Sequence, residues 1–594
     1  MSALTRRSLI LAIGLSAAAL VSLPQVLSSY AQYVVASIAF FSIAVLAVSM
    51  LAGLTGIWSL GHTAFLAFGA YLAANLTALG LPVEAVLVAA FLGAGLFGYV
   101  LGLSTGRFSV LYFGLLTMAL SLAASEVMEH WVEVTGGQQG MTVDPPRLLL
   151  TGASISLGGA FVLSIALATL VFLLVDVVAD SHVGRGWLAV KSQRTAAMAI
   201  GLNPQRENAR AFALSAAITS FAGIGLAYSI AYIDPLGFGL DGGVKLIVAT
   251  VVGGAGSSLG ALLGAAFIVT VPELARAVPA VAYYVFGSAT VLILLFLRRG
   301  IVPSLRTLLR PTSRAAVPAE AVDVVTLTAL VRELLPPASA ALRLENVSVH
   351  FGGVKALDGV SLVLPAGTSI GLIGPNGAGK TTLLNVCSGF YQPVQGAVVR
   401  LGEIDLTGLP AYARIASGLG RTFQHAELFA ELTLRQTFET AAALGAGRRR
   451  AAGLPESAAA DVAERILAGL GLAAYADEFP DMLPFGIQKV ADVGRILATG
   501  ASVIALDEPF AGLDAAERRA IRTILDAMRA AGVSILIIDH AVQEVMAVSD
   551  KVVALEFGRL LVEGDPDYVR QHPEVLRAYF GTSDLSQARK VMAS

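Results

Sequence analysis

The sequence predicts a polytopic α-helical membrane domain followed by an α/β domain that contains a helical subdomain. The composition is the first observation: 56% of the 594 residues are hydrophobic, only 14% are charged, and the mean hydropathy is +0.75. Soluble proteins carry about 25% charged residues on average. The second observation is that long apolar runs fill residues 1–300, whereas residues 341–594 have ordinary mixed composition. The segment 301–340 is rich in proline, alanine and arginine, so we expect a linker with one short helix.

Charge and cysteine content exclude several classes of function. The formal net charge is −2, which gives no basic surplus for nucleic acid, so we expect no nucleic-acid partner. Cys387 is the single cysteine of the sequence, which excludes a disulfide framework and any multi-cysteine metal site. We expect Cys387 to be a small buried hydrophobe in a reducing compartment.

Apolar runs long enough to span a lipid bilayer recur through the first domain. A spanning helix needs about 20 apolar residues, and such runs occur at 8–27, 32–54, 59–80, 83–103, 109–127, 157–178, 208–230 and 280–297. The first run follows Arg6 and Arg7 and has two interpretations, a secretory signal or an uncleaved first helix; we favour the helix. His62 lies inside a predicted span and is a candidate for the transport pathway, with bonding to backbone or interfacial water as the alternative.

A phosphate-binding loop opens the second domain. The apolar strand 369–373 is followed by Gly374-x4-Gly379-Lys380-Thr381 and then by a helix. Backbone N–H groups and the helix N-terminus bind phosphate, Lys380 reaches the β- and γ-phosphates, and the Thr381 hydroxyl ligates Mg²⁺. We therefore predict ATP and Mg²⁺ as cofactors, with nucleotide contacts from Asn376, Gly377, Ala378, Gly379, Lys380, Thr381 and Thr382.

The stretch VIALDEP (503–509) carries the acidic half of the same site. We expect Asp507 to hold Mg²⁺ through water and Glu508 to orient and polarise the attacking water. The distance in sequence from Lys380 to Asp507 requires an inserted subdomain, for which the helical, charged region of about 425–500 is the candidate.

Three further side chains complete the predicted site. His540 follows the apolar strand VSILIID and is placed to contact the γ-phosphate; a solvated surface histidine is the alternative. Gln424 in RTFQ is expected to sense the metal and the attacking water, so it joins Glu508 and His540 as a catalytic candidate and Thr381 and Asp507 as a metal ligand. Phe351 in VHFGG is expected to stack on adenine or to belong to a strand core.

Lysine and arginine placement predicts a cytoplasmic N-terminus, and the nucleotide site requires a cytoplasmic second domain. Segment 243–272 must then leave and return on one side of the membrane. Its centre, GGAGSSLG, predicts two short helices or a re-entrant hairpin, which gives eight full spans, or ten if both arms cross. Such a segment lines the substrate route in some transporters; close helix packing through small residues is the alternative.

Both halves of the sequence resemble branched-chain amino-acid ABC transporters. The second domain resembles their ATPase from LRLENVSVHFGGVKALDGVSL through RTFQHAELFAELTLRQ to VMAVSDKVVALEFGRLLVEGDP. The first domain resembles their permease at GLTGIWSLGHTAFLAFGAY, TGGQQGM, GRGWLAVKSQRTAAMAIGLN and VVGGAGSSLGALLGA. The two parts, which the family usually keeps on separate chains, are joined here.

The resemblance implies a signature loop at LPFGIQ (483–488), where the family pattern is LSGGQ. Leu483, Pro484, Phe485 and Gly486 would then contact ATP bound to an opposing ATPase. Pro484 lacks the usual serine hydroxyl, although Leu-Pro-aromatic-Gly resembles a variant common in these importers, and Ile487 loses a polar contact. Ala541 stands where many relatives have aspartate. We therefore expect an asymmetric ATPase with a weakened signature.

The resemblance also implies the function. We expect ATP-driven import of a branched-chain amino acid or a related amide, urea or carboxylate across the cytoplasmic (inner) membrane, with segment 184–203 as the coupling loop near Gln424. The implied partners are an extracytoplasmic solute-binding protein, the lipid bilayer, and a second permease and second ATPase or a second copy of this chain. The alternatives are an exporter and a membrane-anchored ATPase doing mechanical or signalling work; the short loops and numerous spans argue against the exporter.

Overall fold

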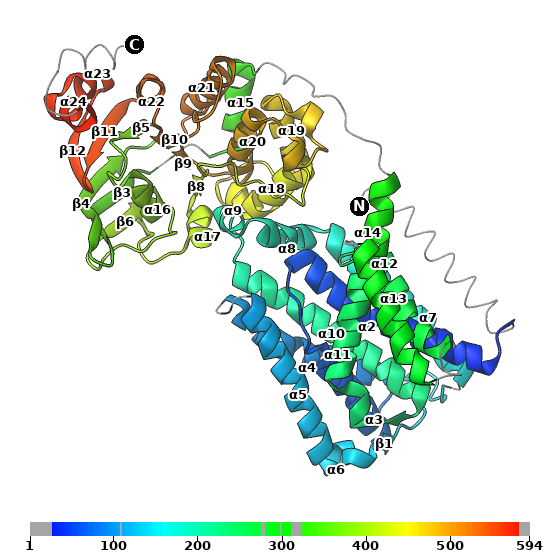
Figure 1. Cartoon of the computed structure of the whole chain (residues 1–594). Helices are drawn as coiled ribbons and strands as arrows, with labels where there is room; N and C mark the ends of the chain where they lie inside the picture. The colour runs from blue at the N-terminus through cyan, green and yellow to red at the C-terminus, as the bar shows by residue number, and fades with distance from the viewer. Residues whose placement is uncertain are drawn as a thin grey trace. The chain divides into compact units, whose positions relative to one another are not determined.

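The segment Leu188–Asn203, which lies within the predicted membrane domain, belongs to the second of two structural units. The computed structural model describes residues 26–274, 279–297, 300–309 and 322–580, apart from residues 107, 109, 156, 337 and 339 (Figure 1). The first unit comprises Met1–Trp187 and Pro204–Arg314; the second comprises Leu188–Asn203 and Ala315–Ser594. No domain boundary inside 1–300 was predicted from the sequence. The segment that belongs to the second unit is short and only weakly polar, so its composition does not distinguish it from the rest of the membrane domain.

The first unit is a bundle of apolar helices. Its principal helices are α2 (Ser29–Thr55), α3 (His62–Ala78), α4 (Val83–Leu103), α5 (Val110–His130), α7 (Leu157–Asp180), α10 (Pro204–Ile230), α11 (Leu240–Gly253), α12 (Ser258–Leu274), α13 (Pro279–Phe296) and α14 (Ile301–Leu309). Within the described residues, five of the helical segments are long and apolar enough to cross a membrane; they correspond to α2, α4, α5, α7 and α10. The predicted run 8–27 lies almost entirely outside the described residues.

Helix α10 runs through the middle of this bundle and packs against α2, α3 and α4 (Figure 1). Small residues allow this, because a Cβ built on Gly223 of α10 would lie 1.9 Å from the Leu66 carbonyl oxygen of α3. The reverse contact is equally close: a Cβ on Gly69 would lie 2.0 Å from the Ser220 oxygen. The helix backbones therefore touch, as is common where small residues meet in membrane proteins.

The predicted break in segment 243–272 separates α11 from α12. Gly256 in the break has φ +79°, and its N–H donates to the Ser49 carbonyl of α2 over 3.1 Å. A Cβ on Gly53 of α2 would lie 2.3 Å from the Gly256 Cα. Two helices with a glycine-rich break are thus present, and the glycines serve close packing against α2.

His62 is fully buried in the first unit and bridges two helices. Its Nδ1 lies 2.9 Å from the Ser59 hydroxyl, and its Nε2 lies 2.7 Å from the Ser215 hydroxyl of α10. Ser215 donates its own proton to the Ala47 carbonyl over 2.8 Å, so its oxygen accepts from Nε2–H of the imidazole. His62 is therefore held as the tautomer with the proton on Nε2, bonded to protein groups on both sides.

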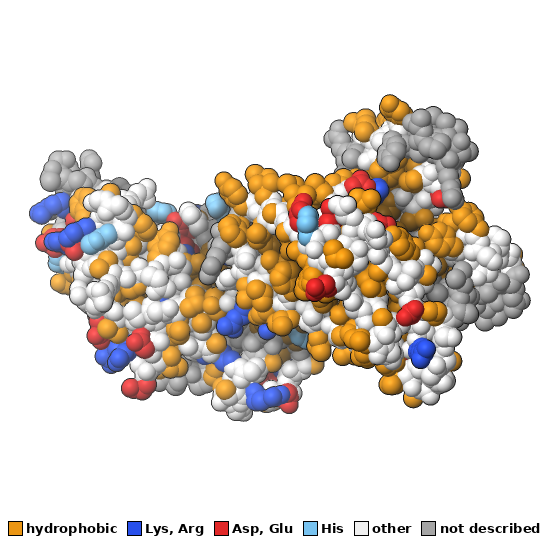
Figure 2. Space-filling view, turned by 90° about the horizontal axis from the view of Figure 1, so that it is seen from below, with side chains coloured by type: hydrophobic (Ala, Val, Ile, Leu, Met, Phe, Trp, Pro, Cys, Tyr) orange, Lys and Arg blue, Asp and Glu red, His pale blue; other side chains and the backbone are white. Residues whose placement is uncertain are grey.

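Outward-facing apolar side chains cover the helices of the first unit. On α4 they recur at Leu92, Leu96 and Val100, and on α7 at Leu170, Leu174 and Val177. Figure 2 shows one face of the molecule with broad apolar areas and only scattered charged side chains. Such surfaces are stable against lipid tails, and rows of this size are not left exposed on soluble proteins.

Two sheets form the frame of the second unit. A six-stranded sheet has the order β12-β11-β5-β10-β9-β8, parallel except for the antiparallel edge pair β11–β12. Its strands are β5 (Ser369–Ile373), β8 (Leu419–Arg421), β9 (Val503–Asp507), β10 (Ser534–Ile538), β11 (Lys551–Glu556) and β12 (Arg559–Gly564). A four-stranded antiparallel sheet has the order β4-β3-β6-β7, with β3 (Leu342–Phe351), β4 (Val354–Leu364), β6 (Val398–Leu401) and β7 (Ile404–Asp405).

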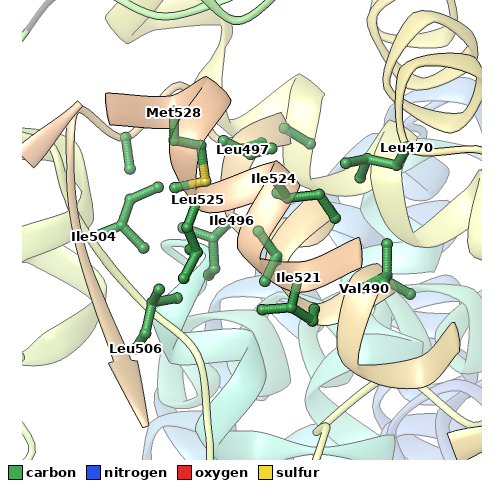
Figure 3. Packing of buried hydrophobic residues seen from close by; sticks show 14 of the residues in the cluster. Leu470, Val490, Ile496, Leu497, Ile504, Leu506, Ile521, Ile524, Leu525 and Met528 are labelled. Atoms are coloured by element: carbon green, nitrogen blue, oxygen red, sulfur yellow. The ribbon is translucent and has the colours of Figure 1, made fainter. Parts of the chain in front are cut away.

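The helices of the second unit lie around this frame. Helix α16 (Lys380–Cys387) follows the phosphate-binding loop, and α18 (Leu434–Ala451), α19 (Ala459–Gly469) and α20 (Phe485–Ala498) occupy the region expected to form the helical subdomain. After α20 come α21 (Ala515–Ala530), α22 (Val542–Val548), α23 (Pro566–Gln571) and α24 (Pro573–Phe580). One apolar core joins subdomain and sheet, since side chains of α20, β9 and α21 belong to the same buried cluster (Figure 3).

The described residues of the expected linker contain two helices, and the second of them is part of the ATPase core. Helix α15 (Val324–Leu334) buries Leu327, Val331 and Leu334 against α19 and α21. Its Arg332 donates to the Ala530 carbonyl over 2.6 Å. The spacing of the buried residues follows one face of a helix, but it covers three turns only and gives a weak signal in a proline- and alanine-rich sequence.

Candidate active site of the second unit

Four parallel strands deliver the predicted groups to one edge of the six-stranded sheet. The phosphate-binding loop follows β5, Gln424 follows β8, Glu508 follows β9 and His540 follows β10. The carboxyl ends of neighbouring parallel strands meet at one edge, which is where open α/β sheets bind ligands. The tertiary structure therefore brings together groups that are far apart in the sequence.

The loop 374–379 has the backbone that a phosphate cradle requires. Gly377 and Gly379 adopt φ +81° and +96°, a region that favours glycine. A Cβ on Gly379 would lie 2.6 Å from the Ala356 carbonyl oxygen, so no larger residue fits there. Helix α16 begins at Lys380, directly after the loop, so its first N–H groups lie at the site.

The Lys380 ammonium is folded over this loop. Its Nζ donates to the carbonyl oxygens of Gly374 at 2.6 Å and Pro375 at 3.0 Å. Burial lowers the pKa of Lys380, and the nearby Glu508 carboxylate opposes that shift. The ammonium is thus held by neutral carbonyls at the mouth of the loop, where a phosphate oxygen would be a stronger partner.

A cleft of about 380 Å³ opens over the loop. It is lined by Val354, Lys355, Ala356, Asn376, Gly377, Ala378, Gly379, Lys380, Thr381, Thr382, Glu508, His540 and Phe557. Every predicted loop residue therefore lines one cleft together with Glu508 and His540. The volume is in the range of small-molecule sites, which run from roughly 300 to 1,000 Å³.

Phe557 was not predicted and lines this cleft, whereas the predicted Phe351 does not. Phe557 is exposed, with φ +46°, in the turn between β11 and β12. Phe351 is half-exposed and packs edge to face on Tyr391, with ring centroids 5.3 Å apart. Nothing in the sequence marked Phe557, because an aromatic residue in a short turn has no pattern of its own. The adenine contact of Phe351 stays a prediction.

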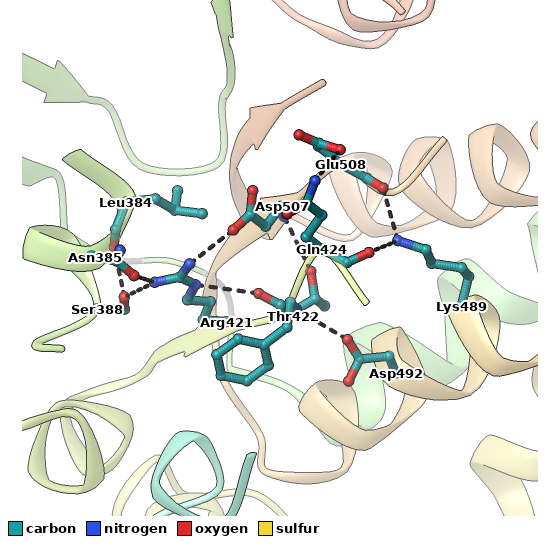
Figure 4. A network of polar contacts seen from close by, with 11 residues as sticks. Leu384, Asn385, Ser388, Arg421, Thr422, Gln424, Lys489, Asp492, Asp507 and Glu508 are labelled. Carbon is teal, nitrogen blue, oxygen red and sulfur yellow. Dashed lines mark hydrogen bonds and ion pairs between the residues drawn. The ribbon is translucent and has the colours of Figure 1, made fainter. Parts of the chain in front are cut away.

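Glu508 belongs to a polar network that Figure 4 shows in part. One carboxylate oxygen accepts from the Gln424 amide at 2.9 Å, and the other lies 3.1 Å from Nε2 of His540. The backbone of Glu508 has φ +49° and its N–H donates to the Ile538 carbonyl over 2.7 Å, which fixes the side-chain direction. A carboxylate held between an amide and an imidazole at a cleft is placed to orient a water molecule.

Lys489 of α20 is a second group that sequence reasoning missed. Its ammonium is buried and donates to the backbone carbonyls of Gln424 and, over 2.9 Å, of Glu508. Its pKa is lowered by burial, while Asp492 is the largest of the opposing charges. Lys489 thus ties helix α20 to two of the three catalytic candidates, Gln424 and Glu508. Its position near the start of an amphipathic helix, one residue after LPFGIQ, was the available signal.

Asp507 is buried at the end of β9 and is not part of the cleft lining. Arg421 lies 2.8 Å from its Oδ2. Burial raises the pKa of Asp507, and the Arg421 guanidinium opposes the shift. Among the described residues no group of three or more His, Cys, Asp or Glu side chains forms a metal cluster. The hard oxygen donors Asp507, Thr381 and Gln424 suit Mg²⁺, which takes its remaining ligands from phosphate and water.

The predicted signature residues do not line the cleft of their own chain. Leu483 is buried, Pro484 and Phe485 are exposed, and α20 begins at Phe485. A Cβ on Gly486 would lie 2.2 Å from Oε1 of Glu517, the third residue of α21, whose N-cap is Asp514. The tip of the loop is therefore fixed against α21 and presents its exposed residues outward, as a contact to a second nucleotide site would require.

Segment 188–203 packs on the part of the second unit that follows Gln424. The Lys191 ammonium lies 2.8 Å from Oε1 of Glu431, and the Ser192 hydroxyl accepts from the Ala430 N–H over 2.8 Å. Ile200 is buried, and Thr195 donates to Glu427. A piece of the permease-family sequence thus contacts residues three to seven positions beyond Gln424, where the coupling segment was predicted to lie; its role in coupling stays a prediction.

Each of the two domains matches a known protein family. Residues 30–297 match the family described as branched-chain amino acid transport system / permease component, and 357–511 match the ABC transporter family. The BraF ATP-binding protein of high-affinity branched-chain amino acid transport from Pseudomonas aeruginosa is 33% identical over 249 residues, 40% of this chain and 97% of that protein. LivG, the corresponding ATP-binding protein of Salmonella typhimurium, is 35% identical over the same coverage.

A solved structure is also similar. An ATP-binding cassette of an ABC transporter in its ADP conformation is 29% identical, covers 41% of this chain and 99% of its own, and has a TM-score of 0.36. Permease and ATPase matches together account for most of the sequence. The chain therefore belongs to the branched-chain amino acid ABC transporter family, and it joins in one polypeptide a membrane permease domain and an ATPase that couples ATP hydrolysis to transport.

Proposed function

We propose that this chain imports a branched-chain amino acid, or a related small amide, urea or carboxylate, across the cytoplasmic membrane at the expense of ATP. The observation that carries the proposal is the pairing of a permease-family domain with the network Gln424–Glu508–His540, adjoined by a permease segment seated beyond Gln424. Hydrolysis and solute movement are thereby connected through one loop.

In the ATPase site, each residue has a proposed task. Lys380 and the N–H groups of the loop bind the phosphates, while Glu508 orients and polarises the attacking water and His540 contacts the γ-phosphate. Thr381, Gln424 and Asp507 are the proposed holders of Mg²⁺, whose chemistry when bound is to neutralise charge that develops on the phosphate oxygens.

Completion of the site requires a second ATPase. The exposed signature residues Pro484 and Phe485 lie outside the cleft of their own chain, so we assign them to nucleotide bound by a partner. That partner is a second ATPase with a second permease, or another copy of this chain. Closure of two ATPases on ATP would shift the permeases between two states through segment 188–203, and hydrolysis would reset them. A solute-binding protein would deliver the solute from outside.

Transport is tested in proteoliposomes that contain the full chain, its partner subunits if any, and the binding protein with radiolabelled leucine. We expect uptake that requires ATP enclosed in the vesicle lumen and binding protein outside, and no uptake with Lys380→Ala. Urea, short amides and aromatic carboxylates serve as competing solutes to define the class. ATP-driven release of preloaded solute in place of uptake would mark an exporter, and hydrolysis without movement of any tested solute would contradict the proposal.

A further inference from the structure

Arg421 is a buried arginine whose charge is matched by Asp507. The two side chains are each 4% exposed, and their N–O distance is 2.8 Å. A buried charge is tolerated only when it is paired and hydrogen-bonded, so this contact is an obligatory feature of the fold. Neither the sequence motifs nor the family matches give Arg421 a role.

The guanidinium is fixed from every side (Figure 4). It donates to the side chains of Asn385 and Ser388 at the end of α16, the latter over 2.9 Å. Its Nε donates to the Thr422 carbonyl over 3.3 Å. The rings of Phe390 and Phe423 lie 5.5 and 5.3 Å from its central carbon. Arg421 therefore connects the helix of the phosphate-binding loop, the strand before Gln424 and the strand that ends in Asp507.

Arg421 fixes the orientation of the Asp507 carboxylate. Arg421 bonds to Oδ2, and no other side-chain hydrogen bond to this carboxylate occurs among the residues that the structure describes. Oδ1 is thus left for a further ligand, while the bond through Oδ2 fixes the plane of the carboxylate. A carboxylate that binds a metal is ordinarily oriented by such an outer partner.

We propose that Arg421 is a positioning residue that holds Asp507 in the orientation needed to bind the nucleotide-associated divalent cation. The inference rests on the proposed role of Asp507 as a metal ligand. Lysine cannot replace arginine here, because an ammonium is a point charge that cannot bond at once to Asn385, Ser388 and Asp507 with the planar fork of a guanidinium.

The test uses Mn²⁺ as the metal probe and a non-hydrolysable ATP analogue on the purified full chain. Bound Mn²⁺ is measured by electron paramagnetic resonance, and metal-free binding of the analogue is measured separately by fluorescence. We expect Arg421→Lys to weaken Mn²⁺ binding by about 10- to 100-fold, the range for loss of an outer-shell partner, with metal-free binding changed less than about 2-fold.

Arg414→Lys is the matched control. Arg414 is also fully buried and bonds to the same end of α16, but its partners are the carbonyls of Val386, Cys387, Thr407 and Leu409. We expect that variant to bind Mn²⁺ as the parent does. Asn385→Ala removes one anchor of Arg421 while it keeps the ion pair, and we expect a smaller loss of Mn²⁺ affinity; this variant carries the test if Arg421→Lys does not fold.

The variants distinguish the metal role of Asp507 from the positioning role of Arg421. If Asp507→Asn keeps full Mn²⁺ affinity, the proposed metal role of Asp507 fails. If Asp507→Asn loses affinity but Arg421→Lys and Asn385→Ala do not, only the positioning inference fails. An equal loss in Arg414→Lys, or a parallel loss of metal-free binding in Arg421→Lys, also overturns it, because either would indicate general damage to the domain.

Discussion

The side-chain amide of Gln424 donates to the Glu508 carboxylate over 2.9 Å, which joins the ends of strands β8 and β9 at the nucleotide cleft. The other carboxylate oxygen lies 3.1 Å from His540. Gln424 is also followed closely by the residues on which segment 188–203 is seated. A displacement of segment 188–203 could therefore move Gln424 and, through it, Glu508, which is proposed to activate water.

Glu508→Gln removes the proposed water-polarising charge and preserves the shape of the side chain. We expect kcat for ATP hydrolysis to fall by about 10²- to 10⁴-fold, the usual contribution of general acid–base catalysis, while ATP binding is retained. Steady-state hydrolysis and filter binding of labelled ATP measure the two quantities. Glu563→Gln on β12, a surface carboxylate 3.8 Å from Lys551, is the control. Normal hydrolysis by Glu508→Gln, in an assembly with no other ATPase, would refute the assignment.

The pair Lys191–Glu431 predicts a reciprocal charge effect on coupling. Both side chains are partly exposed, and such pairs contribute about 0.2–1 kcal/mol. We expect Lys191→Glu to lower solute-stimulated hydrolysis by roughly 2- to 5-fold, because it places a carboxylate against Glu431. The double variant Lys191→Glu/Glu431→Lys should recover most of the loss. Stimulation is measured in proteoliposomes with saturating binding protein; no recovery in the double variant would show that the pair is not a coupling contact.

Pro484→Ser tests the unusual signature loop. Pro484 occupies the N-cap of α20, which has no side-chain cap hydrogen bond. Serine at an N-cap stabilises a helix by about 1 kcal/mol relative to a residue without a cap group, and it would also offer a hydroxyl to the partner's γ-phosphate. We expect a small rise in melting temperature and a few-fold gain in hydrolysis by the assembled transporter, measured at limiting ATP. A fall in turnover would mean that proline is required in this loop.

Leu327→Ala tests whether α15 belongs to the ATPase core. Leu327 is 1% exposed against α19 and α21, so we expect a destabilisation of about 2–5 kcal/mol. Hydrogen exchange of the α15 and α21 amides and denaturant unfolding of the second domain report the change. The control is Val325→Ala on the same helix, where the side chain is 77% exposed and the expected effect is small. Equal effects of the two variants would show that α15 is only loosely attached.

The Cys387 thiol is predicted to be unreactive toward alkylating reagents in the folded chain. It is fully buried at the end of α16, and burial raises the pKa of its thiol from the ordinary 9.0 to about 12. Below pH 9 the thiol is protonated in both the folded and the unfolded chain. As the pH rises from about 9 toward 12, the thiol ionises in the unfolded chain but not in the folded one, so the free energy of unfolding falls. Alkylation by iodoacetamide at pH 8 should therefore be negligible until urea unfolds the domain. Rapid labelling of the native chain, followed by mass spectrometry, would contradict this.

Much of the site could be predicted because each motif carries its local structure with it. The run from Ser369 to Thr381 specifies a strand, a glycine turn and a helix N-terminus, and the structure has all three. The apolar runs likewise predicted most of the long helices that the structure describes in the first unit, and the glycine-rich segment predicted the break at Gly254–Ser257. The recognised family supplied the meaning of the signature loop, which short-range patterns do not give.

The sequence by itself determined the class of each domain, the phosphate loop and the acidic pair Asp507–Glu508, because these depend on local composition and on residues adjacent in the chain. Only the tertiary structure decided that Arg421 faces Asp507, that Lys489 reaches the backbone of Glu508, and that Phe557 rather than Phe351 borders the cleft. It also decided that α15 belongs with the ATPase, and which residues of the predicted coupling segment, 188–203, do so. Each of these depends on contacts between strands and helices far apart in sequence, whose packing no local pattern encodes.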